Sequence, residues 1–95
     1  FMEKYHQVRD KIKIESNLHD KTLEKLQEKM SKKFGEIITM DGIKAIIDED
    51  SWVLVRKSNT EDIIRISAES DNIEKAKTIA QQVRDLVKQS YDQVK

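Results

Sequence analysis

The stretch DGIKAIIDEDSWVLVRKSNTEDIIRISAES, residues 41–70, contains three short apolar runs separated by polar residues. We predict strands at Ile43–Ile47, Trp52–Arg56 and Ile63–Glu69, because β-branched and aromatic residues dominate each run and turn-forming residues bound it. Asp41-Gly42, directly before the first run, is typical of a two-residue hairpin turn. The stretch therefore predicts an antiparallel sheet built from consecutive hairpins.

The last of these strands indicates that only one face of the sheet is buried. Its apolar residues fall on one parity and its polar residues on the other, as expected for a strand with one solvent-facing side. The apolar set is Ile64, Ile66 and Ala68, and the polar set is Arg65, Ser67 and Glu69. We expect helices to cover the apolar face.

Two helical segments flank this region. Apolar residues spaced by three or four predict a helix over Lys21–Phe34, with Asp20 as its N-cap and Gly35 as a left-handed C-terminal cap. A longer helix is expected after residue 70, where Asp71 and Glu74 form a capping box. Its apolar face would consist of Ile73, Ala76, Ile79, Ala80, Val83, Leu86 and Val87.

Two further strands are expected, at Val8–Ile14 and Ile37–Met40, with Val8, Ile12 and Ile14 on one parity. The predicted order is then β-α-β-β-β-β-α. Two amphipathic helices on one face of an antiparallel sheet make a two-layer α+β domain. The other sheet face would remain open to a ligand or to a partner.

Length and composition bound the class of protein. The chain has 95 residues, enough for one domain, and 38% of them are charged while the formal net charge is zero. A neutral chain lacks the basic surface that non-specific nucleic-acid binding requires. There is no cysteine, which excludes disulfides and thiolate metal sites and is consistent with a cytoplasmic location. No apolar run is long enough to span a membrane.

The segment RKSNTED, residues 56–62, holds the most distinctive side chains. The chain has fourteen lysines but four arginines, and two of these, Arg56 and Arg65, bracket this segment. Guanidinium groups bind phosphate oxygens in a bidentate way, and Ser58, Asn59 and Thr60 add hydroxyl and amide donors. A left-handed Asn59 could also aim backbone N–H groups at an anion. The spacing alone leaves two readings open, a polar turn with an arginine paired to a neighbouring acid, or an anion site.

Other candidate sites in the sequence are weaker. His6 and His19 lie at opposite ends of a predicted strand, and we interpret both as surface residues, so no metal site is predicted. Asp48-Glu49-Asp50 lacks the spacing and the glycine of a calcium loop and is expected to be a turn. No arrangement of a nucleophile with a base predicts a catalytic residue.

The joined motifs of residues 41–70 resemble those of the C-terminal domain of the α-D-phosphohexomutases. Members of that family show a DG-[VI]-K hairpin, a W-V-L-V-R strand, an R-P-S-[GN]-T-E-P loop and an R-x-x-x-E strand. In this chain they correspond to Asp41–Lys44, Trp52–Arg56, Arg56–Asp62 and Arg65–Glu69. The resemblance implies a TBP-like fold, β-α-β(4)-α, in agreement with the order predicted from the residues.

The resemblance also implies a function. The family interconverts hexose 1-phosphate and hexose 6-phosphate through a hexose bisphosphate, and this domain holds the phosphate that is not reacting. Arg56, Ser58, Asn59, Thr60 and Arg65 are the residues that would bind it. The phosphoserine loop and the loop that holds Mg²⁺ in the family are not found in this sequence. We therefore expect residues 1–95 to be one substrate-binding domain of a longer enzyme, without mutase activity alone, whose partners are the enzyme's other domains.

Two positions depart from the family pattern, since Lys57 and Asp62 stand where the family has proline. The mixture of loop residues also leaves the sugar undecided among glucose, mannose, glucosamine and N-acetylglucosamine. The alternative function is a non-enzymatic module that binds a partner or nucleic acid on the open sheet face. Such a module should carry basic and aromatic residues across the exposed strands.

Overall fold

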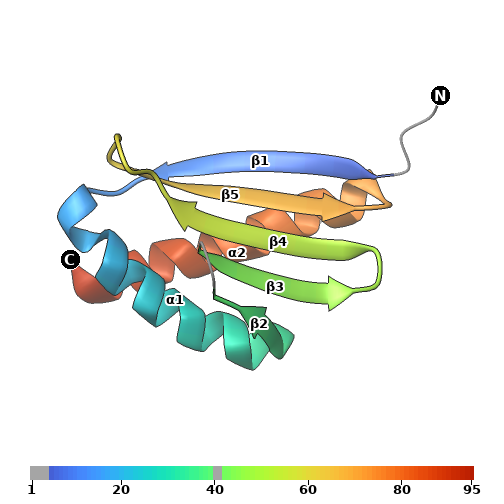
Figure 1. Ribbon diagram of the computed structural model, residues 1–95, viewed down its shortest axis with the longest axis horizontal. Coiled ribbons are helices and arrows are strands. Elements are labelled where there is room, and N and C mark those ends of the chain that lie inside the picture. Colours follow the sequence, from blue (N-terminus) through green and yellow to red (C-terminus); the bar gives the residue numbers. More distant parts are fainter. Residues whose placement is uncertain (1–4, 40–41) are drawn as a thin grey trace.

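The hairpin of β4 (Ser51–Lys57) and β5 (Ile63–Ser70) forms the middle of a five-stranded antiparallel sheet. The computed structural model describes residues 5–39 and 42–95. The elements besides this hairpin are β1 (His6–Lys13), the 3-10 helix η1 (Ser16–Leu18), α1 (His19–Phe34), β2 (Glu36–Ile38), β3 (Ile43–Asp48) and α2 (Ile73–Val94). The strand order in the sheet is β1-β5-β4-β3-β2 (Figure 1).

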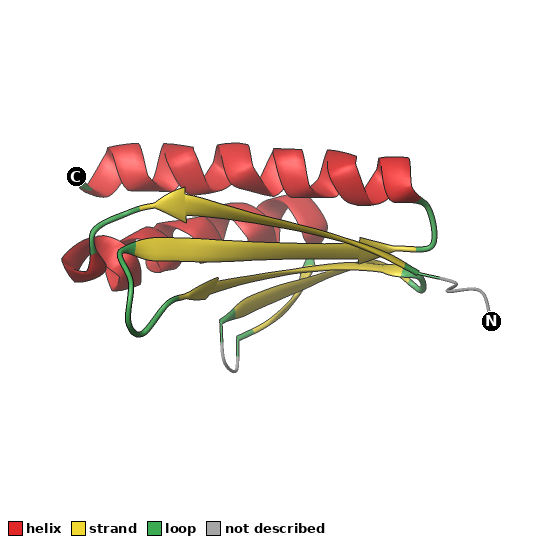
Figure 2. Ribbon diagram, turned by 90° about the horizontal axis from the view of Figure 1, so that it is seen from above, coloured by secondary structure: helices red, strands yellow, loops and turns green. Residues whose placement is uncertain are grey.

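Both helices lie on the same face of the sheet, and no element of residues 5–39 and 42–95 covers the opposite face (Figure 2). The predicted two-layer α+β arrangement is confirmed, as is the TBP-like order of strands and helices. None of the helices described in the two ranges is long and apolar enough to cross a membrane. Because both helices cover the other face, the open face of the sheet is the broad surface on which side chains from several strands can be brought together.

The core lies between this sheet and the two helices. Along β4 and β5 every second side chain is buried, as the alternation predicted. The completely buried apolar residues of this hairpin are Val53, Val55, Ile64, Ile66 and Ala68. From the helices the core receives Leu26, Met30, Val83 and Val87, which have no exposed surface. Ile73, predicted on the apolar face of α2, remains 37% exposed in the first turn.

The first strand follows the predicted parity with one polar exception. Ile12 and Ile14 are buried and Val8 is partly buried against the core. Asp10 lies on the same side, where its carboxylate is 2.5 Å from an Arg84 guanidinium nitrogen of α2. This ion pair explains how a charged residue occupies an inward-facing position on an edge strand.

The start of α1 differs from the prediction. Asp20 is not the N-cap, because η1 leads directly into a helix that begins at His19 and places Leu18 at the cap position. Asp20 instead lies in the first helical turn, where its negative charge interacts favourably with the helix dipole. Gly35 ends the helix with φ +84°, but its ψ of −68° is not that of the left-handed cap we predicted.

The N-cap of α2 is Asn72, one residue after the predicted Asp71. The Asn72 side chain accepts hydrogen bonds from the backbone N–H groups of Glu74 (2.9 Å) and Lys75 (3.3 Å). Because β5 runs through Ser70, the chain needs two further residues to turn away from the sheet before the helix can begin. The prediction identified the right region but the wrong capping residue.

Replacement of Asn72 by alanine should lower the free energy of unfolding by about 1 kcal/mol, the usual cost of losing an N-cap. Asp71→Ala is the matched control, because it removes a neighbouring acid that caps nothing in α2. Urea unfolding of the two variants checks the assignment. Equal losses of stability, or a larger loss for Asp71→Ala, would return the cap to Asp71.

The hairpins on either side of β3 can be compared with the prediction only in part. β3 and β4 are joined at Asp48 and Ser51, where the backbone N–H of Asp50 donates to the Asp48 carboxylate at 2.9 Å, as expected for a turn. β2 is shorter than predicted and ends at Ile38. Met40 and Asp41 lie outside the described residues. Of the predicted turn at Asp41-Gly42, the structure therefore describes Gly42 alone.

Candidate functional site

The loop between β4 and β5 is closed at its base and folded around one hydroxyl group. The Ser58 N–H donates to the Ile63 carbonyl at 3.1 Å, and the Ser58 hydroxyl oxygen accepts from the N–H groups of Thr60 (3.4 Å) and Glu61 (3.2 Å). Asn59 does not have a positive φ. The predicted left-handed Asn59 and outward-facing N–H groups are therefore wrong, because Ser58 takes up those donors inside the loop.

Arg56 and Arg65 lie directly opposite each other on β4 and β5. Both have the parity of the open sheet face, since Val55, Ile64 and Ile66 beside them are buried. Side chains opposite each other in antiparallel strands are separated by about 5 Å at their Cβ atoms, and like charges in such pairs are destabilising. An anion between the two guanidinium groups would remove this repulsion.

A third cation extends this pair. Lys11 of β1 is the register partner of Arg65, so Lys11, Arg65 and Arg56 form a row across three adjacent strands. Glu61 partly compensates the row through a 3.3 Å ion pair with Arg65, but both side chains are more than half exposed. An exposed ion pair of this kind is weak. The predicted pairing of an arginine with a neighbouring acid is thus found between Arg65 and Glu61, and the row of three cations still carries more positive than negative charge.

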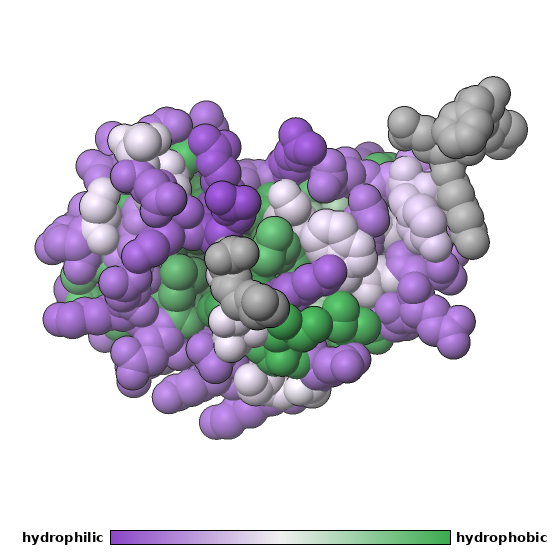
Figure 3. Space-filling model, viewed as in Figure 1, coloured by the Kyte–Doolittle hydropathy of each residue, from purple (hydrophilic) through white to green (hydrophobic). Residues whose placement is uncertain are grey.

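All five predicted site residues border one surface depression of about 560 Å³. The complete lining is Arg9, Leu54, Arg56, Lys57, Ser58, Asn59, Thr60, Arg65 and Ser67. Figure 3 views the open face and shows hydrophilic residues over the β1 side of the sheet, while hydrophobic residues gather over β2 and β3. The depression therefore combines convergent donors with positive charge, as a site for an oxyanion requires.

Arg9 was missed by the sequence analysis. It lies on β1 opposite Ser67 of β5, and its Nε donates to the Gln7 side chain at 3.1 Å. The pairing of the first strand with the last one brings Arg9 beside Arg65, and no local pattern shows this pairing. Its parity within β1 was the one available signal, because residues alternating with Val8 and Ile12 must face away from the core.

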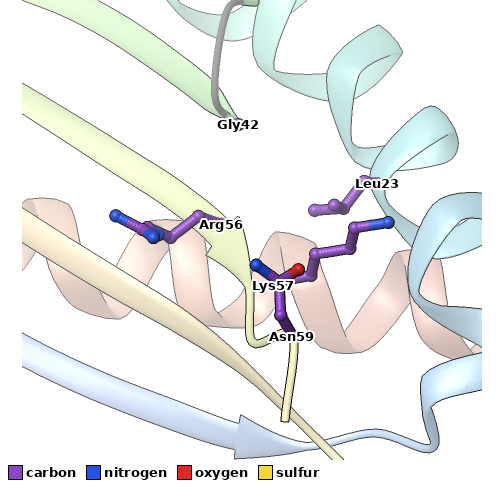
Figure 4. Close-up of a pocket in the computed structure, with 5 residues that line it drawn as sticks. All are labelled: Leu23, Gly42, Arg56, Lys57 and Asn59. Carbon is purple, nitrogen blue, oxygen red and sulfur yellow. The ribbon is translucent and has the colours of Figure 1, made fainter.

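Lys57 borders this depression, but its ammonium group lies at α1. In Figure 4 its side chain extends toward α1 on the side of Leu23, whereas the Arg56 side chain extends in the opposite direction. The Lys57 ammonium lies 2.7 Å from an Asp20 carboxylate oxygen. This contact with the Lys57 ammonium holds the pKa of Asp20 below its usual value. The charge of Lys57 is therefore used in a contact with α1.

Asp62, at the other end of the loop, also contacts the start of the helical segment. Its carboxylate accepts from the Ser16 hydroxyl at 2.5 Å and from the Ser16 N–H at 3.1 Å. These hydrogen bonds from Ser16 hold the pKa of Asp62 below its usual value. Asp62 therefore pairs with neither arginine of the loop.

His19 is another residue that the prediction placed wrongly. It is buried, with 2% of its surface exposed, and its Nε2 lies 2.6 Å from the carbonyl oxygen of Ile14. The chain turns through η1 between Ile14 and His19, and this turn brings the first residue of α1 against the Ile14 carbonyl. In the described part of the chain, no three histidine, aspartate or glutamate side chains are grouped as metal ligands would be.

The chain is a two-layer α+β domain with a donor-rich loop beside a pair of arginines. Comparison with known families places it more closely: residues 7–86 match the model of the phosphoglucomutase/phosphomannomutase C-terminal domain. The chain belongs to this family. The resemblance found in residues 41–70 is thereby confirmed.

Similar proteins carry the names of several phosphohexomutases. The chain is 39% identical over 84% of its length to a probable phosphoglucosamine mutase of Methanothermobacter thermautotrophicus, of which the match covers 18%. It is 45% identical over 78% of its length to a phosphoglucomutase/phosphomannomutase of Thermococcus kodakarensis, covering 16% of that protein. A phosphoglucosamine/phosphogalactosamine mutase of Sulfurisphaera tokodaii is 38% identical over 88% of this chain. The chain thus spans about a fifth of the length of these relatives.

Proposed function

We propose that this domain binds the non-reacting phosphate of a hexose phosphate, in an enzyme that interconverts hexose 1-phosphate and hexose 6-phosphate through a bisphosphate. The observation that carries the proposal is the direct pairing of Arg56 and Arg65 beside the loop hydroxyls. Two guanidinium groups on adjacent strands can hold one phosphate between them in bidentate hydrogen bonds. Arg9 extends the same set of donors from β1.

Binding without reaction fits the chemistry of the loop. A serine or threonine becomes a nucleophile when a general base lies next to it. The Ser58 oxygen instead accepts backbone N–H groups, so its hydroxyl proton remains available for donation to a phosphate oxygen. Phosphoryl transfer and Mg²⁺ binding are assigned by this proposal to other domains of the enzyme, and the domain alone should have no mutase activity.

Remote phosphate binding would contribute to catalysis through position. Binding energy from a part of the substrate that does not react can orient the part that does. In a reaction where either end of the sugar must face the transferring group, a site for the idle phosphate serves both orientations. The relatives' names include several sugars, which agrees with a domain that recognises the phosphate group common to all of them.

The alternative, a module that binds nucleic acid on the open face, is less well supported. Cations do lie on this face, but base stacking needs exposed aromatic rings. Among the strands described here, the one aromatic side chain is Trp52, whose Nε1 donates to Glu69 at 3.0 Å and whose ring lies under the Lys44 ammonium. The face thus lacks an aromatic platform for bases.

Titration of the chain with inorganic phosphate, and separately with glucose 6-phosphate, tests the proposal by NMR. The largest amide shifts are expected at residues 56–60 and at Arg65. Sodium chloride at the same ionic strength is the control for charge screening. Maximal shifts on the helices or over β2 and β3, or equal shifts with chloride, would contradict the proposal.

A further inference from the structure

We infer that Lys57 and Asp62 are positioning residues, which fix the two ends of the β4–β5 loop to the segment Ser16–Asp20. We call the two contacts the loop tethers: Lys57 with Asp20, and Asp62 with Ser16. The inference rests on the proposed function, since it explains how the loop donors are held ready for phosphate. Neither residue faces the arginine pair, so neither is assigned a direct contact with the ligand.

The tether at Asp62 is built from three hydrogen bonds to the connection between β1 and α1. Its carboxylate accepts from the N–H and the hydroxyl of Ser16, and its backbone carbonyl accepts from the Ile14 N–H at 2.9 Å. Ile14 is completely buried in the core. The end of the loop that leads into β5 is therefore joined to a rigid part of the domain.

The tether at Lys57 joins the opposite end of the loop to the same segment. The 2.7 Å contact with Asp20 lies in the first turn of α1, four residues after Ser16. α1 is itself fixed by Leu26 and Met30, which have no exposed surface. Both ends of the loop thus contact one continuous segment, η1 and the first turn of α1, although the exposed Lys57–Asp20 pair alone would be a weak contact.

Holding both ends restricts the residues between them. The four residues from Ser58 to Glu61 are already folded around the Ser58 hydroxyl, and Arg56 and Arg65 lie just outside the tethered positions. A loop without tethers must be ordered when the ligand binds, and the cost of ordering lowers the observed affinity. The lowered pKa of Asp62 and of Asp20 agrees with both carboxylates being held as anions in these contacts.

The test uses the double variant Lys57→Met, Asp62→Ala in this chain, with two readouts. The backbone order parameters of residues 58–61 should fall, and the Kd for inorganic phosphate should rise about tenfold, as when the competent loop is populated about a tenth of the time. Glu49→Ala with Lys88→Met is the matched control, since it removes one exposed acid from the β3–β4 turn and one exposed base from α2. The control should leave both readouts unchanged.

A rescue variant separates positioning from general damage. Lys57→Asp combined with Asp20→Lys exchanges the charges of one tether and should restore much of the loop order lost in Lys57→Asp alone. Unchanged order parameters in the Lys57→Met, Asp62→Ala variant would overturn the inference. It would also be overturned if this variant had a loosened loop but unaltered phosphate affinity, while Arg56→Ala weakened phosphate binding. If the loop loosened in the Lys57→Met, Asp62→Ala variant but Arg56→Ala left phosphate binding unchanged, the proposed function would be overturned and the structural role of the loop tethers would hold.

Discussion

Replacement of Arg56 by alanine is expected to lower kcat/KM roughly 10- to 150-fold in a full-length phosphohexomutase that contains this domain. Hydrogen bonds to charged groups contribute about 1.5–3 kcal/mol, and a loss of this size in transition-state stabilisation corresponds to that fold-change in kcat/KM. Arg56 should matter this much because it faces Arg65 directly and the loop donors lie beside it. In the isolated chain the same variant should lose most of its phosphate-induced amide shifts.

Lys88→Ala is the matched control for Arg56→Ala. It removes the same charge from an exposed position on α2, on the opposite side of the sheet. Steady-state kinetics at several ionic strengths should show a small effect of Lys88→Ala that salt screens. If Arg56→Ala behaved in the same way as Lys88→Ala, Arg56 would contribute to the general field of the domain and not to a site.

The sequence was sufficient to predict the elements because their signals are local. The alternation in residues 63–69 and the spacing in residues 21–34 need no knowledge of distant contacts. Helix starts were the exception, because the capping residue depends on how the preceding segment enters the helix. At α1 this segment is η1, and at α2 it is the last residue of β5, which displaced the caps from Asp20 and Asp71.

The candidate site was predicted as a set of side chains but not as an arrangement. Residues 56–60 are adjacent in the chain, so their composition suggested an anion site beside the alternative of a polar turn, and the family resemblance favoured the anion site. Arg9 and the loop tethers depend on contacts across the fold, such as the one between Ser16 and Asp62, which are 46 residues apart. The burial of His19 depends instead on a local turn, which brings its ring to the Ile14 carbonyl five residues earlier. Long-range register therefore determines the parts of the site that local patterns did not show.

The second large effect is expected at Gly42, the glycine of the DGIK motif. It has φ +136°, a conformation that favours glycine, and a Cβ at this position would lie 2.5 Å from the Val55 carbonyl oxygen and 3.1 Å from the Arg56 Cβ. Gly42→Ala should therefore combine backbone strain of about 1–3 kcal/mol with overpacking of about 1–3 kcal/mol. We expect the free energy of unfolding to fall by about 2–6 kcal/mol.

Gly35→Ala separates the two contributions. Gly35 also has a positive φ, +84°, but nothing lies within 4 Å of the position that its Cβ would occupy. Gly35→Ala should therefore lower the free energy of unfolding through backbone strain alone. The difference between the two variants in urea unfolding then measures the cost of the close approach of Gly42 to β4. Because the atoms that an added Cβ would meet include the Cβ and Cα of Arg56, phosphate binding should weaken in Gly42→Ala and persist in Gly35→Ala. Equal stability losses would mean that β4 moves aside at little cost, and the DGIK glycine would then have no part in placing the arginine.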